Sequence, residues 1–387
     1  MVQKRILPLI VIAQFLCTSL WFAGNAVIPE LIKTFHLSSS AFGHLTSAVQ
    51  LGFISGTLFY ALLALADRFP PSKLFFISSM LAVLSNLAIV ITAEGISGLL
   101  SGRFLTGFFL AGIYPVGMKI AADHYGKDLG KVLGFLVGAL VLGTAFPHLV
   151  KSYSDSLSWK LVFVITSCLA FLGGSLMLLV PNGPFRKASH RIDFSSLFTI
   201  FRVKAFRSAT VGYFGHMWEL YSFWTFVPFI LSIWLMSHPR QQVNIPILSF
   251  IIIAGGSLAC VAAGYISKRY GVGKTANWAL FSSCICCCIS PLMFRMPAGI
   301  FIAFLAFWGL VVIADSPMFS TLVAQNAPVE SRGTALTFVT CIGFSITIVS
   351  IELLNFLKGY IHPDYLFLFL APGPVMGLIF AISLKNK

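Results

Sequence analysis

The chain has 387 residues, of which 58% are hydrophobic and only 10% are charged, and its mean hydropathy is +0.91. A soluble domain carries roughly 25% charged residues, so a globule of this composition would lack the charged surface that keeps such a domain in water. Lipid must therefore surround most of the chain. The net charge of +14 forms no basic face of a soluble fold, which excludes a nucleic-acid-binding protein.

Twelve apolar stretches follow one another, and each is long enough to cross a bilayer as a helix, which takes about 20 residues. The first begins after Lys4 and Arg5 but lacks a cleavage site of small residues, so we expect a retained helix rather than a signal peptide. In chain order the predicted spans cover 6–29, 41–66, 72–92, 95–122, 129–150, 159–181, 207–236, 244–266, 273–293, 297–325, 331–356 and 364–384.

The longest polar segment, residues 182–206, separates six predicted spans from six others. We therefore expect an N-terminal six-helix bundle over residues 1–181 and a C-terminal six-helix bundle over residues 207–387. The segment between them is basic and rich in serine, which is typical of a linker helix that lies on an anionic membrane surface.

Lys and Arg are distributed unevenly between the two sides of the predicted membrane. With the N-terminus inside, the loops and termini on that side hold 19 of the 26 basic residues, and the opposite side holds six. Basic residues collect in cytoplasmic loops. We therefore expect both termini in the cytoplasm, with residues 182–206 as a cytoplasmic linker.

Short motifs of the first half recur in the second half at offsets between 199 and 203 residues. A nearly constant offset across unrelated motifs indicates a duplicated sequence, which is common in transporter folds. It predicts two pseudo-symmetric bundles. The matching pairs are Pro29 and Pro228, Arg68 and Arg269, Pro115 and Pro317, and Gly130 and Gly333.

These features resemble the major facilitator superfamily over essentially the whole chain. That family carries a Gly-x-x-x-Asp-Arg-x-Gly-Arg-Arg signature between spans 2 and 3. The chain keeps the Asp-Arg pair as Asp67 and Arg68 but has neither glycine, whereas the second-half copy keeps Gly264 and Gly271 but has no aspartate. The resemblance implies the major facilitator fold, with twelve transmembrane helices in two six-helix bundles that rock about a central site in the bacterial inner membrane.

Arg103 lies inside the fourth predicted span, in an Arg-x-x-x-Gly signature with Gly107. An ionisable residue inside a membrane costs about 2.5–3.5 kcal/mol on insertion scales, so it is a candidate for a functional role. The resemblance implies that Arg103 modulates proton transfer. The residue type alone also fits binding of an anionic solute, or a purely structural arginine held by backbone carbonyls between helices.

Two acidic residues lie deep in the second half, Glu219 in span 7 and Asp315 in span 10 just before Pro317. Burial penalises the charged form of a carboxyl group, which suits a group that binds and releases one proton in each transport cycle. We expect both acids to contact protons or solute. The alternative is a structural acid that is satisfied by hydrogen bonds.

Further polar and aromatic residues accompany these acids. His216 and Glu219 are three residues apart on one helical face, and with Asp315 they could bind a divalent metal, although such a pair more often forms a hydrogen bond. Aromatic rings near Glu219 could bind a cationic solute through cation–π contacts, although most aromatic side chains of such a chain face lipid. The solute-site candidates added to the two acids and Arg103 are Asn25, His216, Trp218, Tyr221 and Trp224.

A charged cluster is expected at the cytoplasmic ends of spans 2 to 4, formed by Asp67, Arg68, Lys73 and Asp123. By resemblance these residues form a latch that holds the two halves in the outward-facing state and so biases a two-state equilibrium. Ordinary loop charges that reach the membrane surface are the alternative.

The sequence therefore predicts a secondary active transporter that couples a small organic solute to protons by alternating access. The alternatives are a divalent metal ion transporter that uses His216, Glu219 and Asp315, a multidrug or metabolite exporter, and a receptor without transport. No ATPase phosphate-binding motif and no nucleophile–base pair at helical spacing occurs, so we predict neither a primary pump nor an enzyme, and no cofactor. Lipids are expected partners, and a monomer is the expected assembly.

Overall fold

The computed structural model describes residues 2–125, 129–153, 158–186, 200–328 and 332–383. Within these ranges the regular elements are all helices. The chain divides into two compact units, residues 1–192 and 193–387. Of the predicted linker 182–206, residues 187–199 lie outside the described residues.

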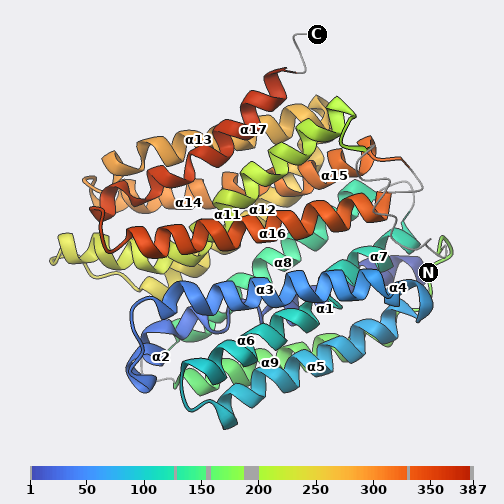
Figure 1. The fold of residues 1–387 in the computed structure, drawn as a ribbon, viewed down its shortest axis with the longest axis horizontal. Helices are drawn as coiled ribbons and strands as arrows, with labels where there is room; N and C mark the ends of the chain where they lie inside the picture. Colours follow the sequence, from blue (N-terminus) through green and yellow to red (C-terminus); the bar gives the residue numbers. More distant parts are fainter. Residues whose placement is uncertain (1, 126–128, 154–157, 187–199, 329–331, 384–387) are drawn as a thin grey trace. The chain divides into compact units, whose positions relative to one another are not determined.

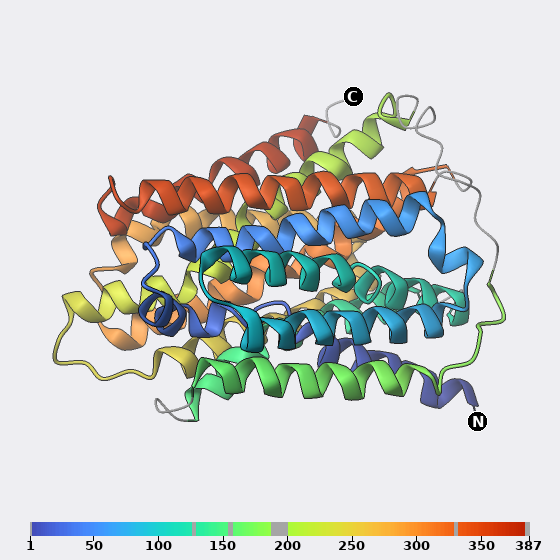
Figure 2. The ribbon, with the colours of Figure 1, turned by 60° about the horizontal axis from the view of Figure 1, so that its bottom comes forward.

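Helices of the first unit run alongside one another, as two views of it show (Figures 1 and 2). They begin and end close to the predicted spans, with the exception of the first. The elements are α1 (Val2–Thr18), η1 (Asn25–Val27), α2 (Ile28–Phe35), α3 (Ala41–Leu62), α4 (Leu65–Arg68), α5 (Pro71–Thr92), α6 (Ile96–Leu110), α7 (Tyr114–His124), α8 (Leu129–Ser152) and α9 (Trp159–Met177).

The second unit has the same kind of architecture. Its first helix begins at Lys204, three residues before the predicted start of span 7 at 207. The elements are α11 (Lys204–Ser237), α12 (Ile245–Tyr270), α13 (Val272–Met293), α14 (Ala298–Ala314), α15 (Ser316–Asn326), α16 (Arg332–Leu357), η3 (Pro363–Leu370) and α17 (Pro372–Ser383).

Eleven helical segments in the described part of the chain are long and apolar enough to cross a membrane, and Arg5–Thr18 forms a shorter apolar helix. The prediction of one continuous first span over 6–29 is therefore wrong. The α-helix ends at Thr18, and an irregular segment leads to η1 and α2, in which Pro29 occupies one of the first two positions. Proline has no N–H to donate, so it begins a helix far more easily than it continues one.

Two other spans are broken at matching places. Span 4 consists of α6 and α7, and Pro115 stands at the start of α7. Span 10 consists of α14 and α15, with Pro317 at the start of α15. Because Asp315 is the residue between these two helices, the break places an acidic side chain at a helix junction inside the span.

The two units repeat one packing pattern. In the first unit α1 packs against α8 and α9, α3 against α6, and α5 against α6 and α7. In the second unit α11 packs against α16 and α17, α12 against α14, and α13 against α14 and α15. Each pair of the second unit joins the helices that correspond, about 200 residues later, to those of the first. This correspondence agrees with the duplication that the sequence motifs indicate.

Two glycines show the same repetition at atomic scale. A Cβ atom added to Gly107 would lie 2.1 Å from the carbonyl oxygen of Val49, and one added to Gly309 would lie 2.1 Å from that of Ile252. In each unit, therefore, a glycine allows two helix backbones to touch. Small residues serve the same purpose at other helix interfaces in membranes.

Candidate functional site

Glu219 lies in the middle of α11, and only 1% of its surface is exposed. Trp308 Nε1 of α14 donates to its Oε1 at 2.6 Å, and Cys287 Sγ of α13 donates to the same oxygen at 3.4 Å. Ser283 Oγ of α13 donates to Oε2. These three partners are neutral, so hydrogen bonds rather than a cation hold the carboxyl group.

Helix geometry explains how three helices converge on this one side chain. Ser283 and Cys287 are four residues apart and therefore lie on one face of α13. The Trp308 ring lies 4.7 Å from the Phe223 ring, 5.5 Å from Phe304 and 5.9 Å from Phe367. These contacts fix the orientation of the indole, which directs its N–H to Glu219.

His216 and Asp315 form a second buried pair next to Glu219. Nδ1 of His216 lies 2.8 Å from Oδ1 of Asp315, and each side chain is 1% exposed. The two atoms are at ion-pair distance but are not aligned as a hydrogen bond. Asp315 is close enough to interact electrostatically with Glu219. The second unit thus brings together the two acids and the histidine that the sequence singled out.

A metal site would need these three groups to converge on one point. No group of three His, Cys, Asp or Glu side chains within the described ranges could hold a metal ion. His216 pairs with Asp315, whereas Glu219 is bonded to Ser283, Cys287 and Trp308. The arrangement is therefore that of a buried polar cluster in which the two acids have separate partners.

The three aromatic candidates on α11 contact one another or other helices of the second unit. Trp218 Nε1 donates to the carbonyl oxygen of Phe369 at 2.9 Å. Tyr221 packs against Trp224 and Phe344, with ring centroids 5.3 and 5.2 Å apart. Trp308 of α14 also contacts this acid through its indole N–H, a contact that the sequence did not predict.

Arg103 of α6 lies buried in the first unit, at 1% exposure. Nη1 donates to the carbonyl oxygen of Leu20 at 3.0 Å and to Asn86 Oδ1 at 3.4 Å, and Nη2 donates to the carbonyl oxygen of Trp21. Leu20 and Trp21 lie in the irregular segment that follows α1. The guanidinium group therefore supplies donors to carbonyl groups where the first span is broken.

Two observations bear on a solute role for this region. Nε of Arg103 is buried and has no hydrogen-bond partner within the part of the chain that the structure describes. Asn25 is 7% exposed, and its Nδ2 donates to Thr46 Oγ1 at 2.7 Å. Arg103 thus combines carbonyl contacts, as in the structural alternative, with one donor that is not used.

Two of the predicted latch residues, Asp67 and Asp123, are joined by a lysine. Lys119 Nζ lies 2.8 Å from Asp67 Oδ1 and 3.9 Å from Asp123 Oδ1. Arg68 and Lys73 are exposed, and neither forms an ion pair with a residue that the structure describes. Among the residues that the structure describes, the ion-paired network at this place therefore consists of two acids around Lys119, all within the first unit.

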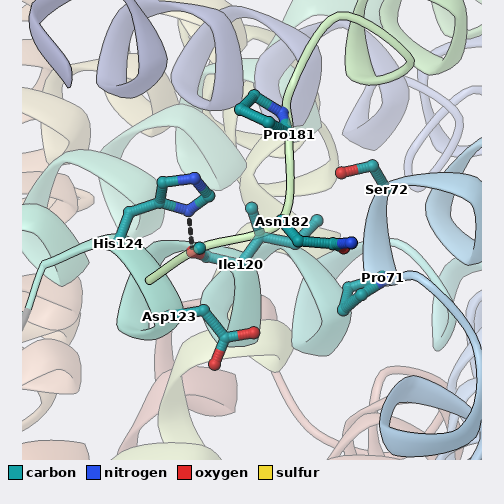
Figure 3. Close-up of a pocket in the computed structure, with 8 residues that line it drawn as sticks. Pro71, Ser72, Ile120, Asp123, His124, Pro181 and Asn182 are labelled. Atoms are coloured by element: carbon teal, nitrogen blue, oxygen red, sulfur yellow. Dashed lines mark hydrogen bonds between the residues drawn. The ribbon is translucent and has the colours of Figure 1, made fainter. Parts of the chain in front are cut away.

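The segment after α9 packs against this network. Figure 3 shows Asn182 and Pro181 in the pocket lined by Asp123 and His124 of α7. Phe185 N donates to the carbonyl oxygen of Asp123 at 3.0 Å, and Arg186 Nη2 donates to that of Asp67 at 3.0 Å. Hydrogen bonds thus tie the beginning of the predicted linker to the ends of α4 and α7.

Sequence reasoning did not identify several of these partners as site residues. Lys119 had a detectable signal, because it precedes Asp123 by four residues and so lies on the same helical face. Ser283, Cys287 and Trp308 had none, since they are 64 to 89 residues from Glu219 in the chain. Asn86, which accepts a hydrogen bond from Arg103, lies 17 residues from it.

Comparisons with known proteins agree with this architecture. The profile of the Major Facilitator Superfamily matches residues 10–351. The chain is 29% identical over 171 residues to the putative uncharacterized transporter YgaY of Escherichia coli K12 and to the uncharacterized transporter YgaY of Escherichia coli O157:H7. In both comparisons the match covers 43% of this chain and 42% of the relative. The chain thus matches less than half the length of these curated relatives.

Proposed function

Because the chain belongs to the major facilitator superfamily and is a membrane transporter, we propose that it is a secondary active transporter in which Glu219 carries the coupling proton. The cargo would be a small organic solute. The two bundles, residues 1–181 and 207–387, would alternate between two states in a bacterial inner membrane, with both termini and the 182–206 linker in the cytoplasm.

The burial of Glu219 among neutral donors is the observation that carries this proposal. A charged carboxylate with no cation partner is costly in a medium of low dielectric constant. Adding one proton removes the charge and leaves the packing intact. A second acid, Asp315, lies near Glu219, and its ion-pair partner is His216. When His216 is protonated, at most one of the two carboxylates therefore has a cationic neighbour.

Arg103 and Asn25 are the first-unit residues that we propose for the solute site. The unused Nε of Arg103 suits a solute with a carboxylate or another hydrogen-bond acceptor. The Arg103 contacts to Leu20 and Trp21 also link any such solute to the broken first span. Trp218, which is half-buried, is a further candidate for solute contact, whereas the buried Tyr221 and Trp224 would contact a solute only in a state in which they are accessible.

We propose that Asp67, Asp123 and Lys119 form the conformational latch. Lys119 draws two acids together at the ends of α4 and α7, and the segment 181–186 packs on the same place. Breaking such a network would shift the balance between two conformations without touching the solute. Arg68 and Lys73 would contribute only if they gain partners in another state.

The test begins with a thermal-shift screen of metabolites, drugs and divalent cations on the purified protein, followed by transport in proteoliposomes. Glu219→Gln should abolish accumulation of the identified solute against its gradient while exchange of labelled for unlabelled solute continues, because glutamine keeps the shape but cannot release a proton. Glu352→Gln, a change of the same chemistry in α16, is the matched control. Unaltered accumulation by Glu219→Gln would show that another group carries the proton.

A metal cargo is the competing outcome of the screen, because the 2.8 Å pair of His216 and Asp315 offers two ligands. In that case a divalent cation, and no organic solute, would stabilise the protein, and His216→Ala would remove the stabilisation. Uptake and export are distinguished by the direction of proton-driven movement in vesicles of known orientation.

A further inference from the structure

The two oxygen atoms of the Glu219 carboxyl group have chemically different partners. Oε1 accepts from Trp308 Nε1 at 2.6 Å and from Cys287 Sγ at 3.4 Å. Oε2 has Ser283 Oγ as its partner. An indole N–H can only donate a hydrogen bond, whereas a serine hydroxyl can both donate and accept. The two positions therefore differ in whether they tolerate a proton on the oxygen.

Trp308 cannot turn its N–H aside easily. Its ring is completely buried and packs against Phe223, Phe304 and Phe367. A proton on Oε1 would point at the indole hydrogen and would break a short hydrogen bond. Oε1 therefore suits the carbonyl oxygen of the protonated acid.

Ser283 has no such restriction, because its hydroxyl hydrogen can rotate. A serine inside a helix can donate to the carbonyl of the preceding turn. Ser290 does so on the same helix, donating to the carbonyl oxygen of Cys287 at 2.8 Å. Ser283 can thus stop donating to Oε2, donate to its own helix instead, and accept a hydrogen bond from a protonated Oε2.

We propose that Glu219 carries its proton on Oε2 and that Ser283 is the positioning residue that changes from hydrogen-bond donor to acceptor when the proton binds. The inference rests on the proposed function. In the loading step one proton from water bonds to Oε2, the carboxylate becomes a neutral acid, and the Ser283 hydrogen moves to a backbone carbonyl. Release is the reverse, and no bond other than Oε2–H forms or breaks.

The other titratable groups around Glu219 are consistent with this assignment. Those that interact with it electrostatically are Asp315, Cys284, Cys286 and Cys287. His216 lies on the same face of α11 and is paired with Asp315. The Cys287 thiol contacts Oε1 and so reinforces the role of Trp308.

The test uses infrared spectroscopy of the purified full chain in nanodiscs and needs no cargo. The carboxylic acid C=O stretching band that Glu219→Gln removes belongs to protonated Glu219. In Trp308→Phe this band should move to higher wavenumber, because the carbonyl oxygen Oε1 loses its donor. Ser283→Ala should also raise the band, whereas Ser283→Thr, which keeps the hydroxyl, and Ser290→Ala, the control on the same helix, should leave it in place.

Two results would overturn the assignment. A band that stays in place in Trp308→Phe but rises in Ser283→Ala would put the proton on Oε1. A band that is the same in Ser283→Ala and the unaltered protein would remove Ser283 from the proton site, and the alanine–threonine comparison holds even if Trp308→Phe fails to fold. If Glu219→Gln removes no band at any pH, the proposed function itself fails instead.

Discussion

Replacing Arg103 by methionine distinguishes two explanations for a cation buried in the first unit. Methionine has a similar length and no charge, so it fills most of the same volume. If Arg103 is there to satisfy the carbonyl groups of the broken first span, its loss should destabilise the protein. If it is kept for function at the expense of stability, its replacement by an apolar side chain should be neutral or stabilising.

The contacts set the size of the effect. Methionine removes the donors to the Leu20 and Trp21 carbonyls and to Asn86 Oδ1. The Leu20 carbonyl keeps a long bond from Ala23 N at 3.5 Å, so it loses only part of its hydrogen bonding. A buried polar group that loses its partner costs about 1–3 kcal/mol. We expect a loss of about 2 kcal/mol, which corresponds to a decrease in Tm of roughly 4–8 °C for a unit of this size.

Thermal unfolding of the purified protein in nanodiscs, followed by tryptophan fluorescence, measures this decrease. Arg103→Lys should fall between the two proteins, because an ammonium group can reach one carbonyl but not both in the fixed geometry of the guanidinium. Arg240→Met, a change at an exposed arginine, is the control. An Arg103→Met variant as stable as the unaltered protein, or more so, would refute the structural explanation.

Two further changes test the latch and the duplication. Lys119→Met should cost less than about 1 kcal/mol, because its ion pairs are partly exposed. It should nevertheless speed the labelling of a cysteine introduced at Asn182, whereas Lys33→Met, a change at an exposed lysine of α2, should not; equal labelling rates in the two variants would argue against the latch. Gly107→Ala and Gly309→Ala should each lower stability by about 1–3 kcal/mol, because each added methyl group meets a backbone carbonyl of the neighbouring helix. Gly264→Ala, where nothing lies within 4 Å of the added atom, should not; clearly different losses at Gly107 and Gly309 would contradict equivalent packing in the two units.

The sequence was informative about the membrane-spanning helices, for which lipid is the solvent. Hydropathy alone located eleven of the twelve predicted spans, because each helix has to satisfy its backbone inside an apolar medium. The proline of 115 and its repeat at 317 also predicted matching structure, and in both places a helix begins. Asp315 stands two residues before Pro317, but its position at a junction between two helices was not predicted and comes from the structure.

The first span shows why other features of the structure could not be predicted from the sequence. Its apolar residues run on through 19–27, so hydropathy predicts one helix. Arg103, 83 residues from Leu20 in the chain, donates to the carbonyl groups of Leu20 and Trp21 just after the helix ends at Thr18, and hydropathy does not show this long-range contact. The partners of Glu219 are a similar case, because packing of α11 against α13 and α14 brings Ser283 and Trp308 to it, and no local pattern encodes that packing.

Proton movement in step with solute movement tests the central claim most directly. In proteoliposomes that contain a pH-sensitive dye, addition of the identified solute should change the internal pH as the solute crosses, and Glu219→Gln should move the solute down its gradient with no change in pH. A pH change of the same size in Glu219→Gln, or none in the unaltered protein, would contradict a coupling proton on Glu219.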